Sequence, residues 1–155
     1  MNSITKSVLS LSAAALLLIA THEGFSSKPY LDTGGVVTNG FGNATINPSK
    51  SVTVVEALED LKTNASNTGK AVTKCVTWPI TQGQYDAYTS FAFNVGTNAF
   101  CKSTMSKKAN QGDKVGSCNE FDKWMFVAGK DCRLKGSNCS GIVKRREEEK
   151  KLCLS

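Results

Sequence analysis

Three side chains near the N-terminus have the chemistry needed to hydrolyse a glycosidic bond. The segment HEGFSSKPYLDTGGVVTNGFGN places Asp32 nine residues after Glu23, and Thr38 six residues after Asp32. Hydrolysis of this bond uses one carboxylic acid that donates a proton and one carboxylate that stays ionised, while a hydroxyl can orient the attacking water. The two carboxyl groups must therefore lie in different environments.

The local sequence predicts such a difference. An apolar run with helical spacing leads up to Glu23, and Gly24 is a natural stop for that helix. The partial negative charge at a helix C-terminus disfavours a carboxylate, so we expect Glu23 to keep its proton and act as the general acid. Asp32 begins a glycine-containing turn with free backbone N–H groups, so we expect it to stay ionised and hold a water. Thr38 follows in the returning strand and can orient that water.

The sequence predicts that the rest of the chain is mostly helical. Three segments carry the pattern of a helix capping box, in which Ser or Thr is followed three residues later by Glu or Gln, and they begin at Thr53, Thr81 and Ser117. The first of these helices should end at Gly69 and the second at Gly96. Ser140 is expected to cap a last helix, whose charge run KRREEEKK is interpreted as a solvated face.

These elements predict an α+β fold, mostly helical, in a single domain that spans residues 1–155. We expect an N-terminal helix over residues 1–22, a small β lobe over 23–52, a connecting helix over 53–70 and a helical lobe over 71–155. An elongated substrate would lie in a cleft between the two lobes.

The apolar run from Val8 to Ala20 has a second interpretation. It has the length of the apolar part of a signal peptide, and it is short for a membrane span. Cleavage after Ala20 would place Leu18 at a position that prefers small residues, and it would leave Glu23 without a helix to orient it. We therefore favour a retained helix. Transient membrane association through residues 7–20, as a signal-anchor that is later released, stays open.

Charge and cysteine content indicate the partner and the compartment. Nineteen Lys and Arg against 13 Asp and Glu give a net charge of +6, which predicts an anionic partner such as cell wall, membrane or nucleic acid. No zinc-finger spacing or aromatic-basic stripe favours nucleic acid. The six cysteines form no C-x-x-C pair and His22 is the single histidine, so we expect disulfides and neither a metal site nor a cofactor.

Six cysteines allow fifteen pairings. Because Cys132 and Cys139 flank a short loop, we expect these two to be joined. The remaining pairs in our expectation are Cys118 with Cys153 and Cys75 with Cys101. Six reduced, buried thiols are the alternative.

Several segments, in this order along the chain, resemble the phage-type lysozymes, the endolysins of glycoside hydrolase family 24. They are HEGF…YLDTGGVVTNGFGN, TQGQYDAYTSFAFNVG, FCKST, NQGD, EFDKW and GIVKRREEE. The resemblance implies a lysozyme-like fold and a monomer that hydrolyses the β-1,4 bond between N-acetylmuramic acid and N-acetylglucosamine of peptidoglycan, with inversion. It also implies synthesis in the host cytoplasm and action in the periplasm and cell wall, for host cell lysis.

The resemblance assigns the acid to Glu23 and the positioning of water to Asp32 and Thr38. Phe93 and Ser103 match family positions that line the saccharide cleft. The chain departs from the family pattern around the catalytic threonine and the last glycine, at Val37, Asn39 and Asn43. These departures leave the substrate preference and the stability of the small lobe open.

Three other functions fit parts of the sequence. A lytic transglycosylase needs the acid but no Asp and Thr to hold water, so the presence of both residues disfavours it. A cationic, membrane-active protein without enzymatic activity would use the apolar N-terminus and the basic surface. A wall-binding module would bind peptidoglycan without cutting it.

Overall fold

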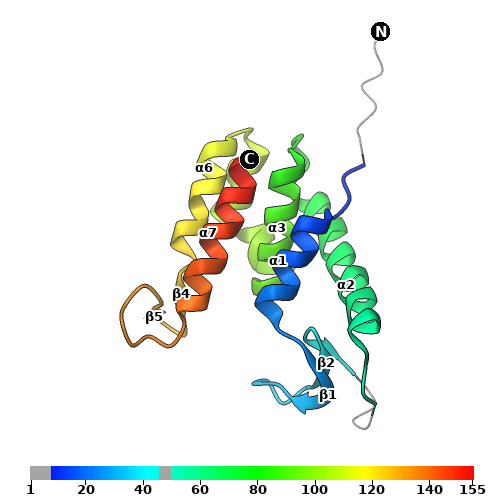
Figure 1. Ribbon diagram of the computed structural model, residues 1–155. Helices are drawn as coiled ribbons and strands as arrows, with labels where there is room; N and C mark the ends of the chain where they lie inside the picture. The colour runs from blue at the N-terminus through cyan, green and yellow to red at the C-terminus, as the bar shows by residue number, and fades with distance from the viewer. Residues whose placement is uncertain (1–7, 46–49) are drawn as a thin grey trace.

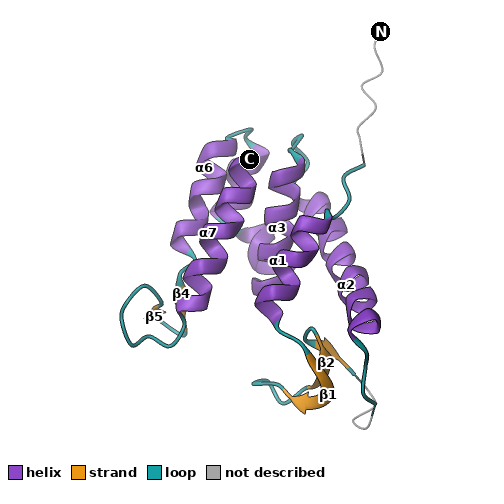
Figure 2. Cartoon of the chain, in the orientation of Figure 1, coloured by secondary structure: helices purple, strands orange, loops and turns teal. Residues whose placement is uncertain are grey.

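A computed structural model describes residues 8–45 and 50–155 of the chain. Figure 1 shows a small antiparallel sheet at one end of a group of helices, and Figure 2 separates helices from strands by colour. The elements in chain order are α1 (Ala13–Glu23), β1 (Ser26–Leu31), β2 (Val37–Gly40), β3 (Asn43–Ala44), α2 (Val54–Cys75), α3 (Gln82–Val95), α4 (Thr97–Lys102), α5 (Thr104–Asn110), α6 (Lys114–Asn119), the 3-10 helix η1 (Glu120–Lys123), β4 (Phe126–Val127), β5 (Lys130–Asp131) and α7 (Ser140–Leu154). The predicted α+β class, mostly helical, is confirmed.

The N-terminal helix is shorter than expected. Residues 8–12 are not helical, and residues 1–7 lie outside the described part of the chain. α1 starts after Ser12, whose hydroxyl accepts from the N–H of Ala15. The same serine donates to the buried carboxylate of Asp86 on α3, from its hydroxyl at 2.6 Å and from its backbone N–H at 3.1 Å. This cap fixes where the helix begins. The predicted end at Gly24 is confirmed.

The capping boxes at Thr53 and Thr81 are both present, and α3 ends at Gly96 as expected. Gly69, however, does not end α2, which continues to Cys75. A Cβ added at Gly69 would lie 2.1 Å from the Tyr85 hydroxyl on α3. The glycine therefore permits two helices to pack closely, and a sequence pattern cannot distinguish this role from a helix stop.

The third predicted box is wrong. Asp113 caps α6 by accepting from the N–H of Gly116 at 2.9 Å, and Ser117 lies inside the helix. Glu120 instead accepts hydrogen bonds from Lys108 and Lys123, at 2.6 and 3.0 Å. The long-range lysine contact thus replaces the local bond that a capping box would form. The last helix also begins one residue earlier than expected, because Cys139 is its cap residue.

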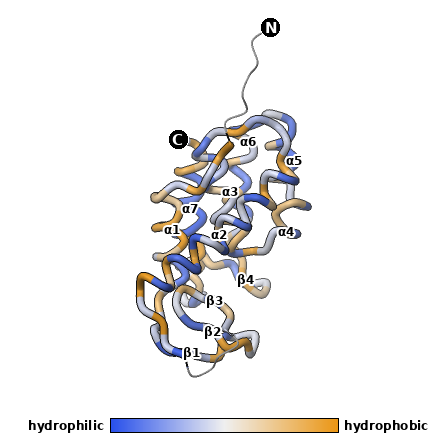
Figure 3. Tube along the Cα trace, turned by 90° about the vertical axis from the view of Figure 1, so that its right-hand side faces the viewer, coloured by the Kyte–Doolittle hydropathy of each residue, from blue (hydrophilic) through white to orange (hydrophobic). Residues whose placement is uncertain are grey.

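The main core surrounds α3 in the helical lobe. Its largest fully buried side chains include Tyr88, Phe91, Phe100 and Phe121. The Phe91 ring meets the Phe121 ring edge-on, with centroids 5.5 Å apart, a favoured geometry for aromatic pairs. A smaller apolar cluster joins α1 to α2. In the turned view of Figure 3 the sheet again lies at the opposite end of the molecule from α5 and α6.

Three disulfides join the cysteines as the sequence analysis expected. Cys75–Cys101 links α2 to α4, Cys118–Cys153 links α6 to α7, and Cys132–Cys139 closes the loop before α7. All three lie beyond the small sheet in the chain, so the cross-links stabilise the helical lobe. Within residues 8–45 and 50–155, no helix has both the length and the apolar character needed to cross a membrane.

Candidate active site

Glu23 lies where the helical lobe meets the small sheet. It is the last residue of α1, and its Oε1 accepts a hydrogen bond from Arg145 Nη1 of α7 at 2.9 Å. Its other oxygen, Oε2, faces the turn between β2 and β3, since a Cβ added at Gly42 would lie 3.6 Å from it. The Glu23 side chain is 24% exposed. One carboxylate oxygen is thus held by the protein, and the other faces the sheet.

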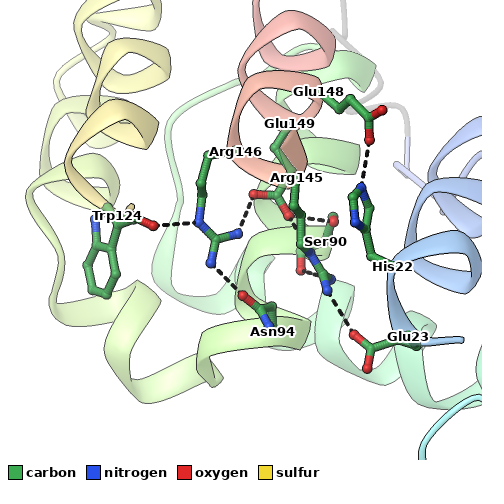
Figure 4. A network of polar contacts seen from close by, with 9 residues as sticks. All are labelled: His22, Glu23, Ser90, Asn94, Trp124, Arg145, Arg146, Glu148 and Glu149. Carbon is green, nitrogen blue, oxygen red and sulfur yellow. Dashed lines mark hydrogen bonds and ion pairs between the residues drawn. The ribbon is translucent and has the colours of Figure 1, made fainter. Parts of the chain in front are cut away.

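Arg145 is positioned by a buried network, shown in Figure 4. Its Nη2 donates to the backbone carbonyl of Ser90 at 3.1 Å and its Nε donates to Glu149 Oε1 at 3.1 Å. The Glu149 side chain is fully buried, and it also accepts from the Ser90 hydroxyl and from Arg146 Nη1, both at 2.7 Å. Two guanidinium groups therefore compensate the charge of one buried carboxylate, as a buried charge requires.

Arg146 extends this network toward η1. Its Nε donates to the carbonyl of Trp124 at 3.1 Å, its Nη2 donates to Asn94 Oδ1, and its guanidinium lies 4.8 Å from the centre of the Phe91 ring. Burial lowers the pKa of Arg146, and the charge of Glu149 opposes this effect. The arrangement fixes α7 against α3 and so fixes the position of Arg145.

Arg145 and its network were not predicted from the sequence. The charge run of the last helix was expected to form a solvated face, whereas Arg145, Arg146 and Glu149 are buried. The spacing of the two arginines from Glu149, at three and four residues, is a pattern that could have suggested pairing. It could not have indicated burial.

His22 joins α1 to α7 beside this network. Its Nε2 lies 2.6 Å from Glu148 Oε2, and this contact is drawn in Figure 4. His22 and Glu23, which are neighbours at the end of α1, thus both contact the same face of α7.

Asp32 occupies the turn between β1 and β2, as predicted. Its Oδ1 accepts from the backbone N–H groups of Gly34 and Val36, both at 2.8 Å. Among the described residues, its Oδ2 has no hydrogen-bond partner. The carboxylate is therefore oriented by the local backbone, with one oxygen left for water or a ligand.

Thr38 lies in the central strand of the sheet, opposite Tyr30 of β1 and Ala44 of β3. It is buried, and its hydroxyl is 3.4 Å from the carbonyl oxygen of Tyr30, a long and weak hydrogen bond. Because this hydrogen bond is weak, the Thr38 hydroxyl can leave the Tyr30 carbonyl for another hydrogen-bond partner with little loss of free energy. Its role in orienting water stays a prediction.

Two residues that depart from the family pattern attach the sheet to its surroundings. The Asn39 amide donates to the carbonyl of Lys50 at 3.1 Å. Asn43 donates to Asp60 at 3.3 Å and accepts from Asn64 at 2.7 Å, both on α2. The hydrogen bonds of Asn43 connect the small lobe to α2 through a neutral side chain.

Among the described residues, no hydrogen bond or ion pair joins Phe93 or Ser103 to Glu23, whose side-chain partner is Arg145. Phe93 is partly buried against the apolar cluster of Ile19 and Leu61. Ser103 caps α5, because its hydroxyl accepts from the N–H of Ser106, and it lines a surface pocket of about 510 Å³. Their substrate roles stay predictions, as does the cleft between the lobes.

In the described part of the chain, no group of three or more His, Cys, Asp or Glu side chains is arranged to hold a metal ion.

The chain is similar to proteins of one family in sequence and in structure. Residues 20–149 match the family model described as phage lysozyme. The endolysin of Acyrthosiphon pisum secondary endosymbiont phage 1 is 36% identical over 145 residues, which cover 92% of this chain and 96% of that protein. The SAR-endolysin of Bacteriophage PS119 is 32% identical over 134 residues, or 85% of this chain and 76% of that protein.

Solved structures agree with the sequence comparison. The muramidase domain of SpmX from Asticaccaulis excentricus superposes with a TM-score of 0.84 at 28% identity, covering 96% of this chain and 99% of that one. A mutant of P22 lysozyme gives a TM-score of 0.80 at 28% identity, covering 96% of this chain and 100% of that one. The match of the family model over residues 20–149, together with these likenesses in sequence and structure, leads to one conclusion: this chain belongs to the phage lysozyme family.

Proposed function

We propose that this chain is an endolysin-type muramidase that cuts the β-1,4 bond between N-acetylmuramic acid and N-acetylglucosamine in bacterial peptidoglycan. It is a glycoside hydrolase that acts on peptidoglycan. The observation that carries the residue assignment is the position of Glu23, between Arg145 of the helical lobe and Gly42 of the sheet. A glycan at this junction would meet the free oxygen of the acid.

Glu23 is the general acid in this proposal. Arg145 donates to Oε1, so the transferable proton is carried on Oε2, on the side of the sheet. That proton passes to the leaving-group oxygen as the glycosidic bond breaks. Arg145 then stabilises the carboxylate that remains. Arg145 is thus a positioning residue, and it does not itself transfer the proton.

Asp32 and Thr38 position the attacking water. Asp32 presents Oδ2, while two backbone N–H groups hold its Oδ1. Thr38 turns its hydroxyl from the carbonyl of Tyr30 toward the water. Attack from the face opposite the leaving group gives inversion at the anomeric carbon, and the proton that the water loses passes to Asp32 Oδ2. This mechanism requires the two carboxyl groups to be about 6.5–9.5 Å apart.

The test of this proposal is Glu23→Gln. The amide keeps the shape of the side chain and an oxygen for Arg145 but cannot donate a carboxylic proton. We expect the release of reducing ends from purified peptidoglycan to fall by about 10²–10⁴-fold, the usual contribution of a general acid. Glu147→Gln on the exposed face of α7 is the matched control and should keep parental activity. Parental activity in Glu23→Gln would show that Glu23 is not the acid.

Product analysis separates the proposal from its rivals. A hydrolase leaves reducing sugar ends, whereas a lytic transglycosylase leaves anhydro ends, which mass spectrometry distinguishes. Proton NMR of the first product identifies its anomer and so tests inversion. Membrane permeabilisation that survives Glu23→Gln would favour the membrane-active alternative. Sedimentation with cell walls without release of reducing ends would indicate a wall-binding module.

The proposed export of the protein is inferred from its relatives. Several relatives are SAR-endolysins, such as those of Bacteriophage PS119 and Escherichia phage 933W. We infer that this chain is likewise made in the host cytoplasm and exported to act, as a monomer, in the periplasm and cell wall. Residues 7–20 would associate with the membrane in transit, a role supported by the exposed Leu17 on α1. The intact mass of active enzyme tests this, because loss of residues 1–20 contradicts a retained α1.

A further inference from the structure

The C-terminal end of α1 meets α7 at two neighbouring points. Glu23 contacts Arg145, and His22, the residue before it, contacts Glu148. His22 Nε2 lies 2.6 Å from Glu148 Oε2, and the exposed fraction is 12% for the His22 side chain and 39% for that of Glu148. Because a carboxylate accepts hydrogen bonds, the imidazole nitrogen donates this one. Figure 4 shows both contacts crossing from α1 to α7.

The apolar side of α1 packs elsewhere. Ile19 and Ala20 form a cluster with Leu61 and Ala65 of α2, and no residue of α7 belongs to this cluster. In the described part of the chain, the hydrogen bonds and ion pairs that join α1 to α7 are the His22 and Glu23 contacts alone. The cluster therefore fixes α1 against α2, whereas these two polar contacts fix its end against α7.

The α7 side of both contacts is rigid. Arg145 and Glu148 are three residues apart and so lie on one face of the helix. Glu149, next to Glu148, is fully buried and pairs with Arg145 and Arg146. One contact would leave the end of α1 free to rotate about it, because the Glu23 and Arg145 side chains are long. A second contact on the same rigid face removes that freedom.

The end of α1 needs such a restraint. Glu23 is the last residue of the helix, and Gly24 follows with a φ of 72°. The last turn of a helix lacks partners for its carbonyl groups, so helix ends fray. A side-chain hydrogen bond one residue before Glu23 opposes this fraying at the place where the carboxyl group must be held.

We propose that His22 is a positioning residue for the acid: its hydrogen bond to Glu148 fixes the end of α1 so that Glu23 Oε2 stays directed toward the sheet. The inference rests on the proposed function, in which Glu23 is the general acid. His22 acts through Glu23, and it transfers no proton to the glycan. Because displacement of a catalytic geometry by about 1 Å can cost about 10²-fold in rate, a contact that prevents a smaller shift affects catalysis measurably.

The test compares side chains that keep the contact with side chains that remove it. His22→Gln keeps an N–H donor near the place of Nε2, whereas His22→Leu has no donor. Glu148→Ala removes the acceptor, and Glu147→Ala, one residue earlier and exposed, is its matched control. The double variant His22→Leu/Glu148→Ala completes the cycle. Release of reducing ends from purified peptidoglycan gives kcat and KM, and thermal unfolding gives the folded fraction at the assay temperature.

We expect kcat to fall by about 10-fold in His22→Leu and in Glu148→Ala, less than the loss from a full 1 Å displacement. KM should stay within about 2-fold of the parent, because neither side chain is placed to bind substrate. The double variant should lose no more than either single variant, as expected for two residues that act through one contact. His22→Gln should recover most of the lost kcat, and Glu147→Ala should match the parent.

Several results would overturn the proposal. Parental kcat in His22→Leu and Glu148→Ala would mean that the contact does not position the acid, and additive losses would mean that the two side chains act separately. A His22→Gln variant as slow as His22→Leu would assign the effect to the charge of the ring. A loss of kcat equal to the loss of folded protein would reduce the contact to a purely structural one.

Failure of the proposed function gives a different result. In that case the parent would release no reducing ends, or Glu23→Gln would keep the parental rate. The contact itself can still be measured, because His22 is the single histidine and its ring gives one set of NMR signals. In a ¹H–¹⁵N spectrum of the untagged protein, the Nε2 signal should shift in Glu148→Ala and stay in place in Glu147→Ala. An unshifted signal in Glu148→Ala would exclude the contact and with it the proposal.

Discussion

The two carboxylates of the candidate site are held in opposite ways. Glu23 is positioned by side chains from a distant part of the chain, through Arg145 and the fully buried Glu149. Asp32 is positioned by backbone N–H groups two and four residues further along its own turn. The position of Glu23 therefore depends on the helical lobe, whereas the position of Asp32 depends on one hairpin.

The two lobes also differ in what stabilises them. The helical lobe contains the main aromatic core and three disulfides. The sheet consists of strands of six, four and two residues. It is attached to α2 through side-chain hydrogen bonds such as that from the Asn43 amide to Asp60. Regions with few buried contacts open at lower free energy than the core. We therefore expect the sheet to open locally while the helical lobe stays folded.

The most damaging change should be Glu149→Gln. It leaves Arg145 and Arg146 buried without the carboxylate that compensates them, a type of loss that costs about 3–5 kcal/mol of unfolding free energy. Urea unfolding followed by circular dichroism measures the effect. The neighbouring exposed Glu147→Gln provides the control. Equal stability of the two variants would mean that the buried network does not stabilise the lobe.

Removing Cys118–Cys153 should have the next largest effect. A native disulfide contributes about 2–5 kcal/mol, and the loss grows with the length of the closed loop. Cys118–Cys153 spans 35 residues and Cys132–Cys139 spans 7. Loop entropy alone makes the longer cross-link worth about 1.4 kcal/mol more. Double serine variants of each pair, compared by thermal unfolding, test this order, and the reverse order contradicts the entropic account.

A change in the sheet should separate activity from stability. Asp32→Asn keeps an oxygen for the N–H groups of Gly34 and Val36 but removes the negative charge. We expect a loss of about 1 kcal/mol or less in stability, since an exposed hydrogen bond contributes about that much. Hydrolysis should fall by about 100-fold or more. Global destabilisation as large as that of Glu149→Gln would show that the hairpin is not an independent local unit.

The smallest effect on stability, that of Glu120→Gln, should appear only at acidic pH. Although burial works to raise the pKa of Glu120, hydrogen bonds from Lys108 and Lys123 hold it below the usual 4.5. The unfolded chain then binds the proton more readily, so this contribution to stability is complete above pH 4.5 and is lost as the pH falls through the lower, folded pKa. Glu120→Gln should flatten the decline of stability in that range. An unchanged slope would exclude this ion pair as a source of the acid sensitivity.

Local patterns in the sequence determined much of this protein. They identified Glu23 at a helix end, Asp32 in its turn and two of the helix starts, because caps and turns depend on neighbouring residues. The order of motifs identified the family, and the short spacing of Cys132 and Cys139 anticipated their disulfide.

Only the tertiary structure decided the contacts between residues that are distant in the sequence, and the helix boundaries that depend on those contacts. Gly69 continues a helix because Tyr85 packs against it, and α1 begins at Ser12 because Asp86 lies within reach. The contact between Arg145 and Glu23 joins residues 122 positions apart, and the charges around it look like a solvated run in the sequence. Composition and spacing did not indicate that this charged face of α7 is buried against such a partner, so the environment of Glu23 follows from packing alone.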